Sequence, residues 1–114
     1  MFSYNFSMLI MLFIYYLVVP KAHLSITSDS PAIIGANITF NALLSGYSRK
    51  SFLTYIFYDG VKTVSFKSEN CNVSISLSFP QELYAEGNHY MNVTVLIIKE
   101  EIAFNYTNFD LRSM

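Results

Sequence analysis

The stretch of sequence that decides the fold is residues 71–79, which run CNVSISLSF. Apolar side chains occupy every second position, at Cys71, Val73, Ile75, Leu77 and Phe79. An asparagine and three serines fill the positions between them. Because successive side chains of a β-strand point to opposite faces of a sheet, this alternation predicts a strand with one buried face and one face in water.

The same alternation occurs on both sides of this stretch, at residues 36–44 and 91–97. With further short apolar runs separated by turn signals, it gives candidate strands at residues 23–27, 36–44, 52–58, 61–66, 71–79, 89–98 and 101–107. No helical periodicity of useful length follows residue 22. The pattern predicts an all-β, antiparallel β-sandwich.

Turn residues punctuate the candidate strands. Asp59-Gly60 predicts a hairpin turn, because glycine tolerates positive φ. Residues 80–86 are expected to form one helical turn that ends at Gly87. The polar residues 99–101 separate two apolar stretches.

Composition limits the classes of function. The 114 residues are 53% hydrophobic and 17% aromatic, which predicts one packed domain rather than a disordered chain. The formal net charge is −1, and Arg49-Lys50 is the only adjacent basic pair, so the chain lacks the basic patch of a nucleic-acid-binding protein. Cys71 is the single cysteine, which excludes an intrachain disulfide.

The N-terminal segment has the features of a targeting signal. Residues 8–19 run MLIMLFIYYLVV, twelve apolar residues in a row. A membrane-spanning helix needs about 20, whereas the core of a cleaved signal peptide needs roughly 7–15. Pro20 ends the segment and Ala22 supplies a small residue before a cut. We predict a signal helix over residues 1–22 and a mature chain from residue 23; the alternative is a buried strand or core helix.

Four N-glycosylation acceptors follow the signal: Asn37, Asn72, Asn92 and Asn105, each in an N-x-[ST] sequon. The alternation puts the first three on the solvent side of their strands. Export and outward-facing sequons together predict an N-linked glycoprotein.

Few residues offer chemistry. The two histidines, His23 and His89, lack metal-binding spacing. The inward position of Cys71 favours a small buried hydrophobe over a reactive thiol, with pairing to a cysteine outside this sequence as a further option. We therefore expect no enzyme, no catalytic residue, no cofactor and no metal site.

Acidic and aromatic residues in the turns have structural explanations. Asp29, Asp59 and Glu86 all fall in turns, where turn chemistry accounts for them better than calcium binding does. In Ig-like sandwiches, a tyrosine near the start of the penultimate strand can hydrogen-bond back to the backbone. Tyr84 or Tyr90 is expected to fill that role.

Two parts of the sequence are similar to known modules. Residues 28–40, SDSPAIIGANITF, resemble the opening of an Ig-like module in the family of the melanocyte protein PMEL and glycoprotein NMB, which includes the transmembrane protein 130 group. In this opening, Asp29 and Pro31 fix a turn that ends the first strand, and Gly35 permits a bend.

The second half is similar to the polycystic-kidney-disease (PKD) domain. Residues 55–60, YIFYDG, and 84–95, YAEGNHYMNVTV, match its aromatic strand, its Asp-Gly turn and its final alternating strand. The chain has no tryptophan, so Phe57 takes the place of that family's strand tryptophan. Either His89 fills the family's tyrosine position, or a bulge turns Tyr90 inward.

The resemblance implies an extracellular or lumenal module of a type I membrane glycoprotein that serves protein interaction, adhesion or trafficking. We expect a PKD-type sandwich over residues 23–98. Residues 99–114 would be a final strand or the start of a linker to sequence absent from this chain, which would supply the membrane association. No nucleic-acid partner is expected, and the protein partner is open. The alternatives are a stand-alone secreted binding domain or a self-assembling, amyloid-like lumenal protein, the latter suggested by the uncharged residues 93–98.

Overall fold

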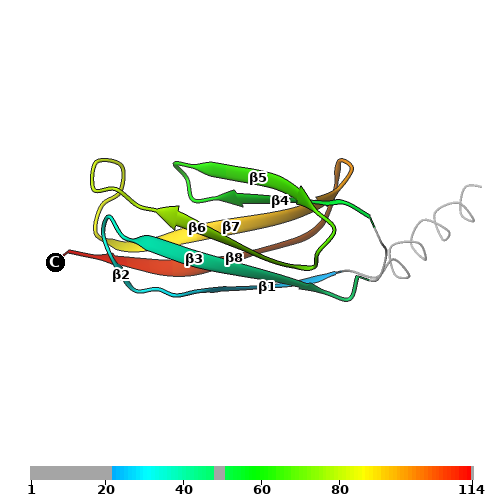
Figure 1. The fold of residues 1–114 in the computed structure, drawn as a ribbon, viewed down its shortest axis with the longest axis horizontal. Coiled ribbons are helices and arrows are strands. Elements are labelled where there is room, and N and C mark those ends of the chain that lie inside the picture. The colour runs from blue at the N-terminus through cyan, green and yellow to red at the C-terminus, as the bar shows by residue number, and fades with distance from the viewer. Residues whose placement is uncertain (1–21, 48–50, 114) are drawn as a thin grey trace, which may run out of the picture.

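The computed structural model describes residues 22–47 and 51–113, which form two β-sheets that lie face to face (Figure 1). The smaller sheet has three strands, in the order β1 (His23–Ser28), β3 (Asn37–Ser45) and β6 (Asn72–Ser78). The larger sheet has five, in the order β2 (Ala32–Ile33), β8 (Glu100–Arg112), β7 (Gly87–Ile97), β4 (Leu53–Tyr58) and β5 (Thr63–Ser68). The prediction of an all-β sandwich is confirmed.

The core between the sheets is built from the alternating strands. Val73 lies in the core and its neighbour Asn72 lies in water, as the pattern of β6 predicts. Phe40 of β3 meets the rings of Phe79 and Phe109 edge-on, with ring centroids 6.1 and 5.3 Å apart. Such edge-to-face pairs add about 0.5–1.5 kcal/mol each beyond the area they bury. These contacts join the small sheet to β8 of the large one.

A second aromatic group fills the part of the core under β4 and β5. Tyr55 and Phe57 of β4 are fully buried, and both stack on Phe66 of the neighbouring strand at centroid distances of 5.6 and 6.1 Å. Phe57 therefore lies in the core, where the resemblance places an aromatic residue.

The chain changes sheets between β1 and β2. Asp29 Oδ1 accepts a hydrogen bond of 2.8 Å from the backbone N–H of Thr39, which ties the turn after β1 to β3. Gly35 has a φ of +94° and donates its N–H to the carbonyl of Phe79. The expected turn at Asp29 and Pro31 and the expected bend at Gly35 are thus present. Beyond the turn, β2 runs parallel to the end of β8.

Three details differ from the sequence-based expectations. The strand β2 was not predicted, because two residues are too short for a periodic pattern. The hairpin at Asp59-Gly60 forms, but β5 begins at Thr63 and not at Val61, so the connecting loop has four residues. The helical turn expected over residues 80–86 is shorter than expected: it covers residues 81–83, and the N–H groups of Leu83 and Tyr84 donate to the Pro80 carbonyl.

Strand β7 lies inside the large sheet, between β4 and β8. Residues 92–96 of this strand pair with both neighbours, although a bulge interrupts the register with β8 after Val95. The segment that the sequence marked as an aggregation hazard, residues 93–98, therefore has most of its length covered by pairing.

The last strand continues the sandwich past residue 98. A turn at Ile98 and Lys99 joins β7 to β8, which pairs with β7 along nearly its whole length. The predicted signal segment, residues 1–22, lies outside the described residues except for Ala22. Among the residues described, no helix is long and apolar enough to cross a membrane.

Candidate functional site

The most connected polar group is the carboxylate of Asp59, in the β4–β5 loop. Its Oδ1 accepts hydrogen bonds from the backbone N–H groups of Val61 and Lys62, at 2.8 and 2.7 Å. Its Oδ2 accepts a bond of 2.6 Å from the hydroxyl of Tyr84, 25 residues further on. Gly60, with a φ of +94°, lets the chain reverse direction between β4 and β5. Asp59 thus ties the loop to the segment that precedes β7.

Tyr84 is buried and holds this connection in place. Burial, then the hydrogen bond and the negative charge of Asp59, raise the pKa of the Tyr84 hydroxyl well above its usual value of 10. Lys62 also belongs to this group, because its Nζ donates to the Ser78 carbonyl and lies 5.7 Å from the centre of the Tyr84 ring. The side-chain polar atoms of Asp59, Tyr84 and Lys62 all have hydrogen-bond partners within the protein, which indicates a structural connection.

The expected hydrogen bond from Tyr84 to the backbone is not the one observed, because a carboxylate takes its place. A different tyrosine makes a bond to the backbone: Tyr55 donates to the carbonyl of Asn70. Burial, followed by the proximity of Cys71, raises the pKa of Tyr55 to about 12. Tyr90 is 52% exposed and lies on the outer face of the sheet.

The remaining titratable candidates are dispersed. His89, not Tyr90, points inward: its ring stacks on Phe109 at 5.4 Å, and its Nε2 lies 2.7 Å from the Ala85 carbonyl. His23 begins β1, and Cys71 is half-buried against the core. Within residues 22–47 and 51–113, no three His, Cys, Asp or Glu side chains lie close enough together to hold a metal ion.

A shallow depression lies beside Gly87, the first residue of β7, whose φ is +117°. Glu86, Tyr84, Ile34 and Ser113 are among the residues that line it. The carboxylate of Asp29 lies elsewhere, bound to Thr39, so the turn acids do not converge on one point.

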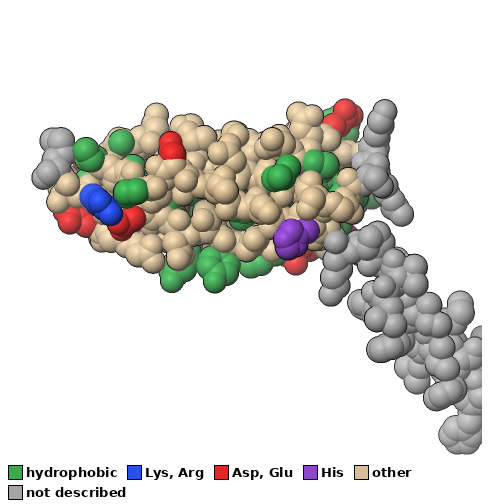
Figure 2. Space-filling view, turned by 90° about the horizontal axis from the view of Figure 1, so that it is seen from below, with side chains coloured by type: hydrophobic (Ala, Val, Ile, Leu, Met, Phe, Trp, Pro, Cys, Tyr) green, Lys and Arg blue, Asp and Glu red, His purple; other side chains and the backbone are tan. Residues whose placement is uncertain are grey.

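Two of the sequon asparagines share the outer face of the small sheet. Asn37 and Asn72 are both exposed. The register puts Asn72 opposite Leu43, six residues along β3 from Asn37, which corresponds to about 20 Å. Between them the face carries serine, threonine and asparagine, including a hydrogen bond from Ser74 to Asn41. Figure 2 views the molecule from the side of β1 and shows few charged side chains away from its two ends.

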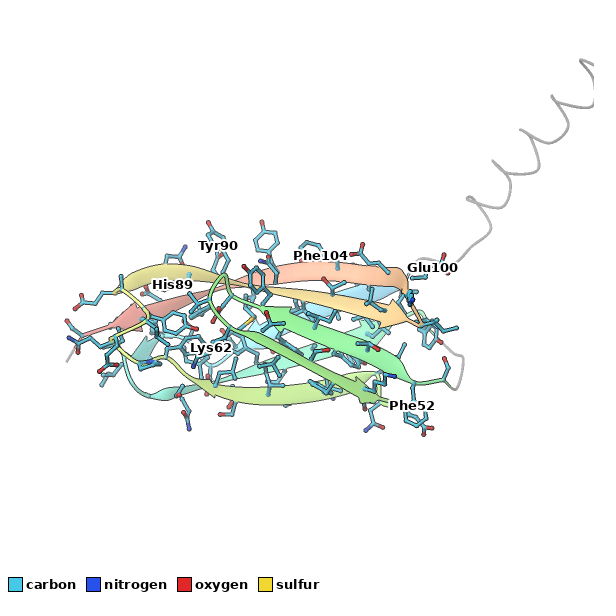
Figure 3. The ribbon with its side chains drawn as sticks, turned by 90° about the horizontal axis from the view of Figure 1, so that it is seen from above. Phe52, Lys62, His89, Tyr90, Glu100 and Phe104 are labelled. Atoms are coloured by element: carbon cyan, nitrogen blue, oxygen red, sulfur yellow. The ribbon has the colours of Figure 1, made fainter. Side chains whose placement is uncertain are left out.

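The third acceptor, Asn92, lies in different surroundings on the outer face of the large sheet. It is partly exposed and stands directly opposite Tyr58 on β4 and Tyr106 on β8. Tyr90, two residues earlier, and Phe104 lie on the same face, and Figure 3 shows both pointing away from the sheets. Sequence reasoning missed this aromatic face, because only the register of three strands assembles it.

The fourth acceptor, Asn105, points the other way. It lies opposite the buried Val93, on the inner side of β8, and its Nδ2 donates a hydrogen bond of 2.7 Å to the carbonyl of Leu24 on β1. The atom to which a glycan would attach therefore faces β1. Asn105 therefore points inward, whereas the other three acceptors point outward.

Comparison with known proteins returns no relative: no family model, no curated protein and no solved structure matches this chain.

Proposed function

We propose that this chain is a non-enzymatic, extracellular or lumenal glycoprotein module that serves protein interaction, adhesion or trafficking. The observation that carries the proposal is the position of three sequons. Asn37, Asn72 and Asn92 lie on outward faces of the sandwich, on both sheets, where attached glycans leave the core undisturbed. The apolar segment at residues 8–19, with the length of a signal-peptide core, supplies the route to the glycosylation machinery.

The strand order supports an Ig-like, PKD-type sandwich within this proposal. In Ig-like sandwiches, two antiparallel sheets pack face to face with connections that cross between them. Here the chain crosses between the sheets after β1, after β2, after β3, after β5 and after β6. Residues on which the two resemblances rest take the structural roles expected of them, which supports the proposal: Asp29, from the stretch similar to the PMEL and NMB family, binds across the first turn, and Phe57 and Asp59-Gly60, from the stretch similar to the PKD domain, lie in the core and in a hairpin.

Expression in cultured mammalian cells with the natural N-terminus tests the proposal. We expect the protein in the medium, with a gel mobility that increases after treatment with peptide N-glycosidase. A matched variant with Asn37→Gln, Asn72→Gln and Asn92→Gln should show a much smaller change. A product that stays in the cytosol with unchanged mobility would contradict the proposal.

A further inference from the structure

The outer face of the large sheet carries an exposed aromatic cluster, consisting of Tyr58, Tyr90, Phe104 and Tyr106. Their exposed fractions are 46, 52, 53 and 54%, so about half of each side chain is in contact with water. The rings of Tyr90 and Tyr106 touch, with centroids 5.8 Å apart. Hydrophobic surface gathered in this way marks a site that something covers.

Asn92 stands in the middle of this aromatic cluster. Tyr58 and Tyr106 are its direct cross-strand neighbours on either side, at the roughly 5 Å that separates facing side chains in a sheet. Tyr90 precedes it on the same face at about 7 Å along the strand. A group attached to Asn92 Nδ2 therefore starts between three aromatic rings.

The chemistry of an N-glycan fits this position. Its first sugar, N-acetylglucosamine, has ring faces lined by C–H groups, which are attracted to the electron-rich face of an aromatic ring. Its hydroxyl and acetamide groups can remain in water or meet the tyrosine hydroxyls. The neighbouring outer-face residues, Thr94 and Asn108, are uncharged and small, so they leave the rings accessible.

The other outward acceptors lack such surroundings. Asn37 faces Ser78 across the strands, and Asn72 faces the single apolar residue Leu43. The chain therefore contains its own comparison between a sequon among aromatic rings and sequons on a polar face.

We propose that the glycan on Asn92 packs its first sugar against Tyr58, Tyr90 and Tyr106 and forms part of the folded structure, whereas the glycans on Asn37 and Asn72 extend into solvent. This inference rests on the proposed function, because it requires passage through the glycosylation machinery. The aromatic cluster is accordingly covered by the protein's own carbohydrate.

The test uses the secreted full chain, trimmed with an endoglycosidase so that each occupied site keeps one N-acetylglucosamine. Urea unfolding is measured for the parent, Asn92→Gln and the control Asn72→Gln, and again for the same three proteins made without glycans. The difference between the two sets removes the effect of the side-chain change itself. We expect the sugar on Asn92 to lower the unfolding equilibrium constant on the order of fivefold, and the sugar on Asn72 to leave it unchanged.

The aromatic contacts are tested by repeating the Asn92 comparison in a Tyr106→Ser background, where the stabilisation by the sugar should fall to less than half. Should that variant fail to fold, nuclear Overhauser effects between isotope-labelled sugar protons and tyrosine ring protons in the parent protein give the answer directly.

Two results would overturn the inference and leave the proposed function standing. One is an occupied Asn92 whose sugar neither stabilises the protein nor gives contacts to the rings. The other is an empty Asn92 in a protein whose Asn37 and Asn72 are glycosylated. Absence of glycan from all three sites would overturn the inference and the proposed function together.

Discussion

Replacing Tyr84 by phenylalanine removes one oxygen atom from the best-defined long-range connection in the sandwich. The hydroxyl of Tyr84 donates to Asp59 Oδ2 at 2.6 Å, and the ring lies in the core against Phe79 at a centroid distance of 4.9 Å. Phenylalanine keeps the ring and its packing. The substitution therefore isolates the hydrogen bond between the β4–β5 loop and the start of β7.

The size of the effect follows from the charge and the surroundings of Asp59. A hydrogen bond to a charged group contributes about 1.5–3 kcal/mol. Asp59 is partly exposed and keeps its bonds from Val61 and Lys62, so water can replace part of what is lost. We therefore expect the lower end, about 1.5 kcal/mol, which at the m-value of a small domain lowers the urea midpoint by about 1 M.

Urea unfolding followed by far-ultraviolet circular dichroism measures this shift. Tyr90→Phe is the matched control, since Tyr90 lies exposed on the outer face and the same change there removes a hydroxyl outside the core. The control midpoint should move by less than about 0.3 M, as is usual for surface substitutions. If Tyr84→Phe also unfolds within that margin, the connection through Asp59 does not contribute to stability and the structural role assigned to it is wrong.

Three further predictions concern the core, a turn and the pH dependence of stability. Phe57→Ala should lower the free energy of unfolding by about 3–5 kcal/mol, because it opens a cavity beneath β4. The control Phe52→Ala removes a side chain that is 62% exposed and should change this free energy by less than about 0.5 kcal/mol. Equal urea midpoints for the two variants would contradict the position of Phe57 in the core. Gly35→Ala should cost about 1–2 kcal/mol, because its φ of +94° is unfavourable for a residue with a Cβ although nothing obstructs that atom; a calorimetric melting temperature equal to that of the parent would show that the bend relaxes. The pKa of Tyr55 is raised to about 12, so the folded state holds its proton more tightly than the unfolded chain, whose tyrosines titrate near 10. The stability that this raised pKa provides is complete below pH 10 and is lost as the pH rises toward 12. The urea midpoint should therefore fall more between pH 9 and pH 11 for the parent than for Tyr55→Phe. Equal falls would exclude Tyr55 as the source of the pH dependence.

Much of the sandwich could be predicted from local alternation. In β7, Met91, Val93 and Val95 lie in the core and Asn92 faces outward, as the two-residue period requires. The alternation is a property of consecutive residues, so it can be recognised in one strand without knowing which strands lie beside it. This is why the outward positions of Asn37, Asn72 and Asn92 could be found from the sequence.

Strand β8 shows where the same rule fails. Taken alone, the polarity of Phe104, Asn105, Tyr106 and Thr107 would put the aromatic rings inside and the polar side chains outside. The pairing of Asn105 with Val93 imposes the opposite arrangement. A local pattern is overridden here by the register with β7, and such conflicts concentrate where a surface serves another purpose.

Other features depend on contacts between residues far apart in sequence. The carboxylate of Asp59 accepts hydrogen bonds from the N–H groups of Val61 and Lys62, so these two residues belong to a four-residue loop and β5 begins only at Thr63. The partner of Tyr84 is 25 residues away, and no spacing rule identifies it. The two residues of β2 become a strand only because the end of β8 lies beside them.

Site-resolved glycan occupancy tests the central claim most directly. The protein recovered from the medium of secretory cells is digested to peptides, and peptide N-glycosidase removes their glycans in heavy-oxygen water, so that each formerly occupied asparagine becomes an aspartate with a mass label. We predict occupancy at Asn37, Asn72 and Asn92 and an empty Asn105, because the Asn105 side chain points to the inner side of β8 and a glycan on its Nδ2 would have to fit between β8 and the Leu24 carbonyl of β1. Absence of label at all three outward sites, or label at Asn105 alone, would contradict the account.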